Sequence, residues 1–264
     1  MRSLLYAFYG LICNLYSGII TLLENLFLKK SPKKSNFLEK KGFIKINKKL
    51  NLNKSKRIFD LVFSSTSKFF HPNKYHRRLI LSEKNLEELV NLIFDKKFCH
   101  FLSSLTGYKY SIDFIGAYEN FNIPQRDRKK SWYANHYHLD KPNSQNMLKV
   151  FIPLADIGID DGPLEVMSIN QTKKYFLTQK LNKNFEKFHM LGVLGDIFLC
   201  KLNLCLHKAG IPDKGITTKL IMIQLNPSRN WFKSSKLYKR QYMREPKFTS
   251  LGNRFVDRKK LIIS

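Results

Sequence analysis

The sequence predicts a mainly β fold with flanking α-helices, arranged as an antiparallel sandwich or jelly roll and preceded by an apolar N-terminal helix. Three observations support this prediction. From about Tyr108 the apolar runs are short, β-rich and separated by turn residues. Before that point, apolar residues recur at helical spacing, and the chain starts with a long uncharged stretch. A hydrophobic content of 43% excludes a disordered basic tail.

The first element expected is a helix in residues 1–28. Residues 3–23 carry no charge and are long enough to cross a bilayer. Small or polar residues form one stripe on this otherwise apolar helix: Ser3, Ala7, Gly10, Asn14, Ser17, Thr21 and Glu24. The stripe has three interpretations: a seam against another membrane helix, the wet edge of a helix lying in the interface, or a solvent-facing side whose opposite face packs on the protein's own core.

The next segment, residues 29–58, is expected to be a basic linker. Residues 29–57 hold twelve Lys and Arg against the single acid Glu39, a net charge of +11 within a chain whose total is +27. If the first helix spans a membrane, this segment stays on the cytoplasmic side, and if the helix lies flat, the lysines face anionic lipid. Both interpretations predict a cytoplasmic catalytic domain, attached to the membrane face through residues 3–23. The alternative is a solvated charged loop.

Residues 59–227 are expected to form the main domain. Its helical part is predicted at Ser82–Thr106, one long helix ended by Gly107, with a shorter helix at Lys56–Ser65. The strands follow in five apolar runs: 110–116, 148–155, 163–167, 192–202 and 218–225. Residues 228–264 form a basic C-terminal extension of net charge +9, which either stays solvated or folds over a sheet edge.

The cysteines indicate a reducing compartment rather than a disulfide framework. Four are present, and none forms a C-x-x-C pair: Cys13, Cys99, Cys200 and Cys205. We expect buried thiols.

The residues that suggest chemistry are His138 and Asp140. Two residues apart on a strand, they point to one face and can offer an imidazole nitrogen and a carboxylate oxygen to one cation. A second histidine would complete a facial triad, which suits non-haem Fe(II) and leaves positions open for a cosubstrate and O₂. The pair is a weak signal alone, so its context must support it. His136 falls on the same strand face.

The order of features after this pair resembles the phytanoyl-CoA dioxygenase-like family of Fe(II)/2-oxoglutarate oxygenases. A strand, the turn Asp161-Gly162-Pro163, the turn Gly195-Asp196, a further strand and then His207 follow in turn, and the likeness covers about residues 108–227. The resemblance implies a double-stranded β-helix. It also implies that His138, Asp140 and His207 bind iron, and that 2-oxoglutarate is decarboxylated to succinate while O₂ oxidises a substrate.

The same resemblance implies a basic residue on the strand after the distal histidine, which holds 2-oxoglutarate. Lys219 matches that position, although the family commonly has arginine there, and lysine lacks its rigid bidentate fork. Lys149 is a second candidate for this role, and Thr217 or Thr218 could add a hydroxyl. The stretch from Met167 to Thr172 stands where relatives often carry Gly-Ser-His.

The substrate is expected to be a small molecule or a lipid-like molecule. His136, Arg126 and Arg128 are candidate substrate contacts, because the two arginines lie just upstream of the ligands and can meet an anion. A second hypothesis is a catalytically inactive β-helix protein that binds membranes or polyanions through its charge. No recognisable nucleic-acid-binding module is present. The sequence leaves the oligomeric state open.

Overall fold

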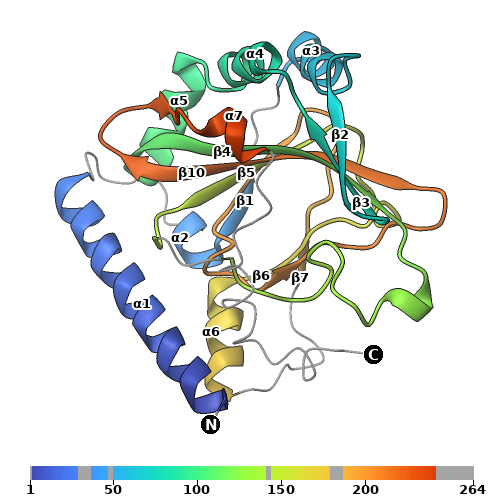
Figure 1. Cartoon of the computed structure of the whole chain (residues 1–264). Helices are drawn as coiled ribbons and strands as arrows, with labels where there is room; N and C mark the ends of the chain where they lie inside the picture. Colours follow the sequence, from blue (N-terminus) through green and yellow to red (C-terminus); the bar gives the residue numbers. More distant parts are fainter. Residues whose placement is uncertain (1, 29–36, 47–49, 141–143, 179–186, 242–264) are drawn as a thin grey trace.

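A computed structural model describes residues 2–28, 37–46, 50–140, 144–178 and 187–241, with side chains described from residue 15 onward. The chain is mainly β-sheet with flanking helices, as the sequence predicts (Figure 1). The helices are α1 Arg2–Phe27, α2 Phe37–Lys41, α3 Leu52–Val62, α4 Glu83–Ile93, α5 Lys96–Thr106, α6 Ile169–Thr178 and α7 Leu237–Arg240, with a short 3₁₀ turn at Gln125–Asp127. The strands are β1 Phe43–Ile46, β2 Lys68–Asn73, β3 His76–Ile80, β4 Lys109–Phe121, β5 Leu148–Pro153, β6 Glu165–Met167, β7 Lys187–His189, β8 Ile197–Cys200, β9 His207–Lys208, β10 Thr217–Ser228 and β11 Phe232–Lys233.

The strands form two sheets. The larger has the order β1-β8-β5-β10-β4-β3-β2, with β11 paired to β4, and the smaller has the order β7-β6-β9. Each of the five apolar runs singled out in the sequence overlaps a strand, and β4 and β10 extend beyond their runs at both ends. The hairpin β2–β3, which the sequence analysis did not predict, extends the larger sheet beyond β4 by antiparallel pairing, with Arg78 opposite Tyr118.

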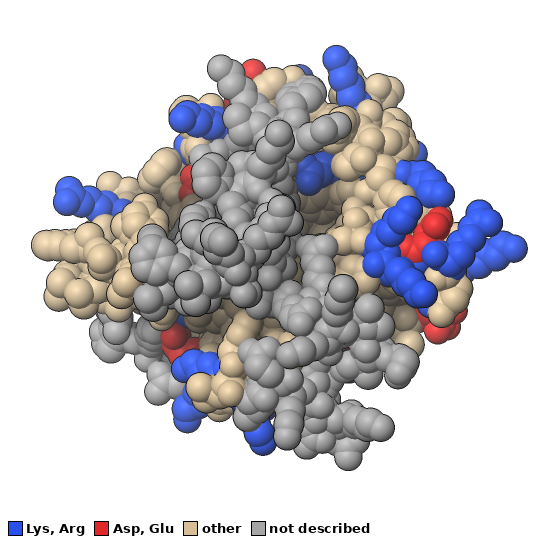
Figure 2. All heavy atoms as spheres, turned by 60° about the horizontal axis from the view of Figure 1, so that its bottom comes forward, with Lys and Arg blue, Asp and Glu red and all other residues tan. Residues whose placement is uncertain are grey.

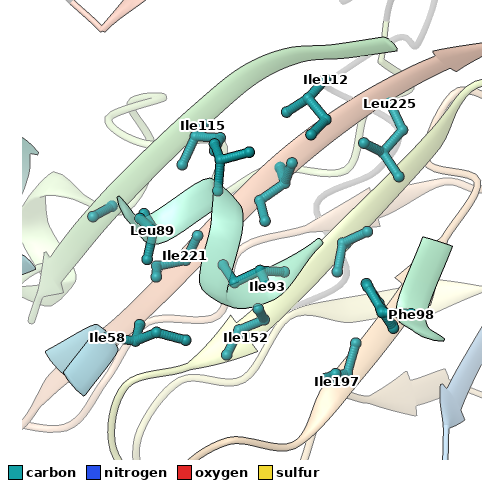
Figure 3. Packing of buried hydrophobic residues seen from close by; sticks show 14 of the residues in the cluster. Ile58, Leu89, Ile93, Phe98, Ile112, Ile115, Ile152, Ile197, Ile221 and Leu225 are labelled. Atoms are coloured by element: carbon teal, nitrogen blue, oxygen red, sulfur yellow. The ribbon is translucent and has the colours of Figure 1, made fainter. Parts of the chain in front are cut away.

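Helices α3, α4 and α5 cover one face of the larger sheet, and the smaller sheet lies on the other side (Figure 1). The core between helices and sheet is aliphatic: Leu89 and Ile93 of α4 pack on strand residues such as Ile221 (Figure 3). Because side chains alternate along a strand, Ile221 and Ile223 of β10 face this helical layer, whereas Leu220 and Met222 face the smaller sheet. The same alternation decides which residues reach the functional site.

The single long helix expected at Ser82–Thr106 is two helices. α4 ends at Ile93, and the side chain of Asp95 then accepts a hydrogen bond from the Phe98 amide at 2.8 Å, which caps the start of α5. Gly107 ends α5 in the left-handed conformation (φ 83°), as predicted. The break between α4 and α5 is not visible in the sequence, because apolar residues keep their helical spacing through Phe94 and into α5.

The segment expected as a basic linker contributes to the fold instead. Its β1 pairs antiparallel with β8 at the edge of the larger sheet. Lys45 of β1 lies 2.6 Å from the fully buried carboxylate of Asp196, in the predicted Gly195-Asp196 turn. Lys45 is exposed on this edge strand, a position where lysine is common, and the other described basic residues of the segment lie in helices, Lys40 and Lys41 in α2 and Lys54, Lys56 and Arg57 in α3.

The beginning of the basic C-terminal extension also packs on the domain. β11 pairs with β4, and the side chain of Gln241 exchanges hydrogen bonds with the backbone of Leu81 at 3.0 and 3.2 Å. Residues 228–241 thus cover part of the larger sheet. Residues 242–264 lie outside the described part of the chain.

Helix α1 turns its polar stripe toward the domain. Ser17 is buried, Thr21 accepts a hydrogen bond from the Gln145 amide at 3.0 Å, and the carboxylate of Glu24 accepts one from Asn146 at 3.0 Å. The interpretation in which the apolar face packs on the protein's own core is therefore wrong for the described part of α1. No helix among the described residues is long and apolar enough to cross a membrane.

Candidate metal centre

Three side chains from two segments meet between the sheets. The backbones of His138 and His207 pair antiparallel, with N–H to O=C distances of 2.9 and 3.1 Å. The amide of Asp140 donates a hydrogen bond to the carbonyl of Leu202 at 3.1 Å, which holds Asp140 close to the part of the chain that leads to His207. One potential ligand atom from each of His138, Asp140 and His207 lies within 4.8 Å of the other two.

Both imidazoles are oriented by backbone carbonyls. The Nδ1 of His138 lies 2.8 Å from the carbonyl oxygen of His136, and the Nδ1 of His207 lies 2.9 Å from that of Cys205. A carbonyl oxygen only accepts, so each Nδ1 carries the proton and donates, and in the neutral form of such an imidazole Nε2 is the nitrogen with the lone pair. This outer hydrogen bond is the usual way in which a protein fixes a metal-binding histidine.

The electrostatics keep both kinds of ligand in the form that binds cations. Burial lowers the pKa of His207 to about 3, and the neighbouring His138 lowers it further, so the imidazole is neutral at physiological pH. Burial alone would raise the pKa of Asp140, but the ammonium of Lys149 at 2.6 Å, together with the two histidines, holds it well below its usual range. Asp140 is therefore a carboxylate.

The triad opens into a cavity of about 320 Å³ between the two sheets. This volume is large enough for a small organic molecule. Near the triad its wall is formed by Lys149 and by apolar side chains of two strands, β5 and β10, and of turns: Phe151, Leu164, Leu202, Leu220 and Met222. On the other side it is lined by aromatic and polar groups: His76, Arg78, Tyr118, Asn120, Trp132 and Tyr133.

Of the residues expected to hold 2-oxoglutarate, the structure brings only Lys149 to the triad. Lys219 has the same strand parity as Ile221, so it lies on the helical face of the sheet, with its ammonium 5.4 Å from the ring centroid of Phe63. Thr218 is buried and donates to the carbonyl of Asp161. Its hydroxyl thus holds the Asp-Gly-Pro turn, and it does not line the cavity.

The three expected substrate contacts also lie outside the cavity wall. Arg126 is exposed in the 3₁₀ turn, and Arg128 donates to the carbonyl of Ile123 at 2.9 Å. His136 supplies the carbonyl that orients His138, whereas its own ring nitrogen Nε2 is buried without a hydrogen-bond partner. It is a neighbour of the ligands rather than a wall residue.

The wall residues that sequence reasoning missed come mainly from β3 and β4. Nδ1 of His76 lies 2.7 Å from the side-chain oxygen of Asn120, and the guanidinium of Arg78 lies 5.5 Å from the ring centroid of Tyr118. The only signal in the sequence is the alternation of His76 and Arg78, which puts both on one strand face. Nothing in their spacing relates them to a triad about 60 residues later.

Comparison with known proteins supports the fold. No protein-family model matches the sequence, and no curated protein sequence does. Among solved structures, HygX from Streptomyces hygroscopicus, crystallised with nickel and 2-oxoglutarate, is similar with a TM-score of 0.53 and 10% identity over 72% of this chain and 85% of that one. EctD from S. alaskensis with bound Fe is similar with a TM-score of 0.52 and 13% identity over 81% and 88%.

These likenesses show a fold shared with one protein crystallised with nickel and 2-oxoglutarate and with another crystallised with iron. The donor set is an independent observation on this chain: two imidazoles and one carboxylate, next to an open cavity, suit Fe(II) with coordination positions left for other ligands. The residues present therefore fit an Fe(II) ion with 2-oxoglutarate.

Proposed function

We propose that this chain is an Fe(II)/2-oxoglutarate-dependent dioxygenase of the phytanoyl-CoA dioxygenase-like kind, built on a double-stranded β-helix. The observation that carries the proposal is the triad of His138, Asp140 and His207, whose ligand atoms converge beside a cavity of about 320 Å³. With 2-oxoglutarate and O₂, bound iron would supply the hydroxylation of a substrate C–H bond, with release of succinate and CO₂.

The chain's own residues have separable tasks in this proposal. His138, Asp140 and His207 hold the metal, and the carbonyls of His136 and Cys205 keep the two imidazoles in the ligand tautomer. Lys149 is the cation next to Asp140, and we assign it to a carboxylate of 2-oxoglutarate. The apolar side chains around Leu220 and Met222 limit the access of water to the reacting centre.

The far wall supports a substrate that carries an anionic or hydrogen-bonding group. Arg78 supplies a positive charge, His76 and Asn120 supply polar groups, and Tyr118 with Trp132 supplies flat apolar surface. We propose a small-molecule or lipid-like substrate that binds this wall and points its reacting carbon toward the triad. The proposed location of the enzyme is the cytoplasm, at the face of a membrane.

Anaerobic titration of the full chain with Fe(II) and then 2-oxoglutarate tests the proposal. We expect a visible metal-to-ligand charge-transfer band in the wild type and its loss in His138→Ala. The matched control is His100→Ala, which removes an exposed histidine of α5 and should leave the band intact.

A well-folded wild type without the band, or a band that persists in His138→Ala, would overturn the proposal. The first result would favour a catalytically inactive β-protein that acts through its charge.

A further inference from the structure

The described part of α1 exposes its apolar side. Seven large apolar side chains on it are between 44% and 69% exposed: Leu15, Tyr16, Ile19, Leu22, Leu23, Leu26 and Phe27. They recur at steps of one, three and four residues, so they form one continuous stripe, here called the outer face of α1. Figure 1 shows the helix at the edge of the molecule.

The helix is fixed to the domain by its polar side, which is the reverse of the usual arrangement on a globular protein. Glu24 accepts hydrogen bonds from Ser144 and Asn146, and the hydroxyl of Tyr108 donates to Asn25. Ser17, one turn before Thr21 on the same side, is 3% exposed. The outer face is therefore directed away from the protein by specific contacts.

The sequence extends the same spacing toward the N-terminus. Large apolar residues occur at the preceding positions of the stripe: Leu4, Leu5, Phe8, Leu11 and Ile12. The seven exposed apolar side chains from Leu15 to Phe27 already form a patch, unlike the singly scattered exposed hydrophobics of a soluble protein, and such a patch normally marks an interaction surface.

The charge of the chain indicates what the outer face contacts. The total is +27, and residues 29–57, which follow the helix directly, have a net charge of +11. The described charged side chains on the face shown in Figure 2 are mainly Lys and Arg. A second copy of the chain would bring two such charges together and be repelled, whereas an anionic lipid surface attracts them.

We propose that the outer face of α1 binds the surface of an anionic lipid bilayer, with the helix lying in the plane of the interface and its polar side kept on the domain. Apolar insertion and electrostatic attraction then act together, and this pairing of two signals is what stable interfacial attachment requires. The inference goes beyond the proposed enzyme activity and does not depend on it, because lipid binding requires neither the metal nor 2-oxoglutarate.

Co-sedimentation of the full chain with lipid vesicles tests the proposal. The probes are vesicles of phosphatidylcholine alone and of phosphatidylcholine with about one third phosphatidylglycerol, a content that gives a strongly negative surface. The variant is Ile19→Gln with Leu26→Gln, which removes two side chains that are 57% and 66% exposed and leaves the polar contacts of the helix in place. The matched control is Ile159→Gln with Leu177→Gln, at apolar residues 62% and 85% exposed elsewhere on the molecule.

We expect the wild type and the control to bind the anionic vesicles, and the α1 variant to bind at least roughly tenfold more weakly. Binding to phosphatidylcholine alone should be weaker than to the anionic vesicles, because it lacks the electrostatic part. Three results would overturn the proposal: no binding by the wild type, equal binding by the α1 variant, or a wild type that is a dimer in solution and becomes monomeric in the α1 variant without any vesicle binding.

Discussion

Replacing Lys149 by methionine tests the electrostatics of the candidate metal centre. The ammonium of Lys149 is 10% exposed and lies 2.6 Å from the carboxylate of Asp140, which is 19% exposed. At that distance the gross attraction is about 6 kcal/mol with an effective dielectric constant of about 20. Desolvation offsets much of it, but removing one partner leaves a buried charge uncompensated. We therefore expect Lys149→Met to lower the free energy of unfolding of the metal-free protein by about 3 kcal/mol.

A metal ion should reverse this effect. Bound Mn²⁺, used as an air-stable substitute for Fe(II), supplies to Asp140 the positive charge that Lys149 supplies without metal. In the wild type the ion must displace the Lys149 ammonium from the Asp140 carboxylate or share the carboxylate with it. In Lys149→Met no ammonium competes with the ion for that carboxylate. By thermal unfolding, the variant should lose roughly 6–12 °C with EDTA and recover most of it with Mn²⁺.

The matched control is Lys201→Met. Lys201 is 4% exposed and forms a comparable ion pair with Glu39 at 2.6 Å, outside the cavity wall. The Lys201→Met protein should be destabilised to a similar extent, and Mn²⁺ should not restore its unfolding temperature. The reasoning is refuted if Lys149→Met has the unfolding temperature of the wild type in EDTA, or if Mn²⁺ stabilises both variants equally. In the Mn²⁺-loaded variant, 2-oxoglutarate should bind at least roughly tenfold more weakly, since its cationic partner is absent.

Three further predictions concern the scaffold and pH. Leu89→Ala, at a fully buried core position, should lower the free energy of unfolding measured in urea by about 3 kcal/mol. A decrease below about 1 kcal/mol would contradict the packing. Gly162→Ala should lower the free energy of unfolding by more than about 1 kcal/mol in the same assay. The reason is that φ is +67° and the new Cβ would lie 2.4 Å from the Pro212 nitrogen. An unchanged urea midpoint would exclude this turn geometry. Burial lowers the pKa of His76 to about 4, so the unfolded state takes up the proton first as pH falls below 6.5 and stability is lost toward the acid side. This residue should account for about 2 kcal/mol of the loss between about pH 7.5 and pH 5, and His76→Asn should reduce the loss by that amount, whereas an unchanged pH profile would refute the assignment.

The strands and the triad could be predicted because both depend on local pattern or chain order. Each apolar run between turn residues overlaps a strand, since burial on both faces selects β-branched and aromatic residues in short runs. The spacing of His138 and Asp140 pairs them on one strand face, whereas His207 is assigned to them because the order of features resembles an oxygenase family. The strands follow from local pattern alone, and the third ligand follows from comparing the order of features along the chain with that of the family.

The anchor for 2-oxoglutarate could not be found in the same way. The loop between His207 and β10 interrupts the alternation of side chains, so the sequence contains no information on which parity of β10 faces the triad. The structure puts Leu220 and Met222 on that face and Lys219 on the other. The far wall with Arg78 was missed because it comes from β3, whose place beside β4 is a long-range pairing. One-dimensional spacing contains no such pairing.

Helix α1 illustrates a limit of a different kind. The heptad-like spacing of polar and apolar residues predicted an amphipathic helix, but amphipathicity has two solutions, because either side can face the protein. What decides between them is a small set of polar partners, Ser144, Asn146 and Tyr108, which lie more than 80 residues away in the sequence. These partners turn the polar stripe inward, so the apolar stripe faces outward. This orientation of α1, together with the basic charge of the chain, is the basis of the proposed binding of the helix to an anionic bilayer.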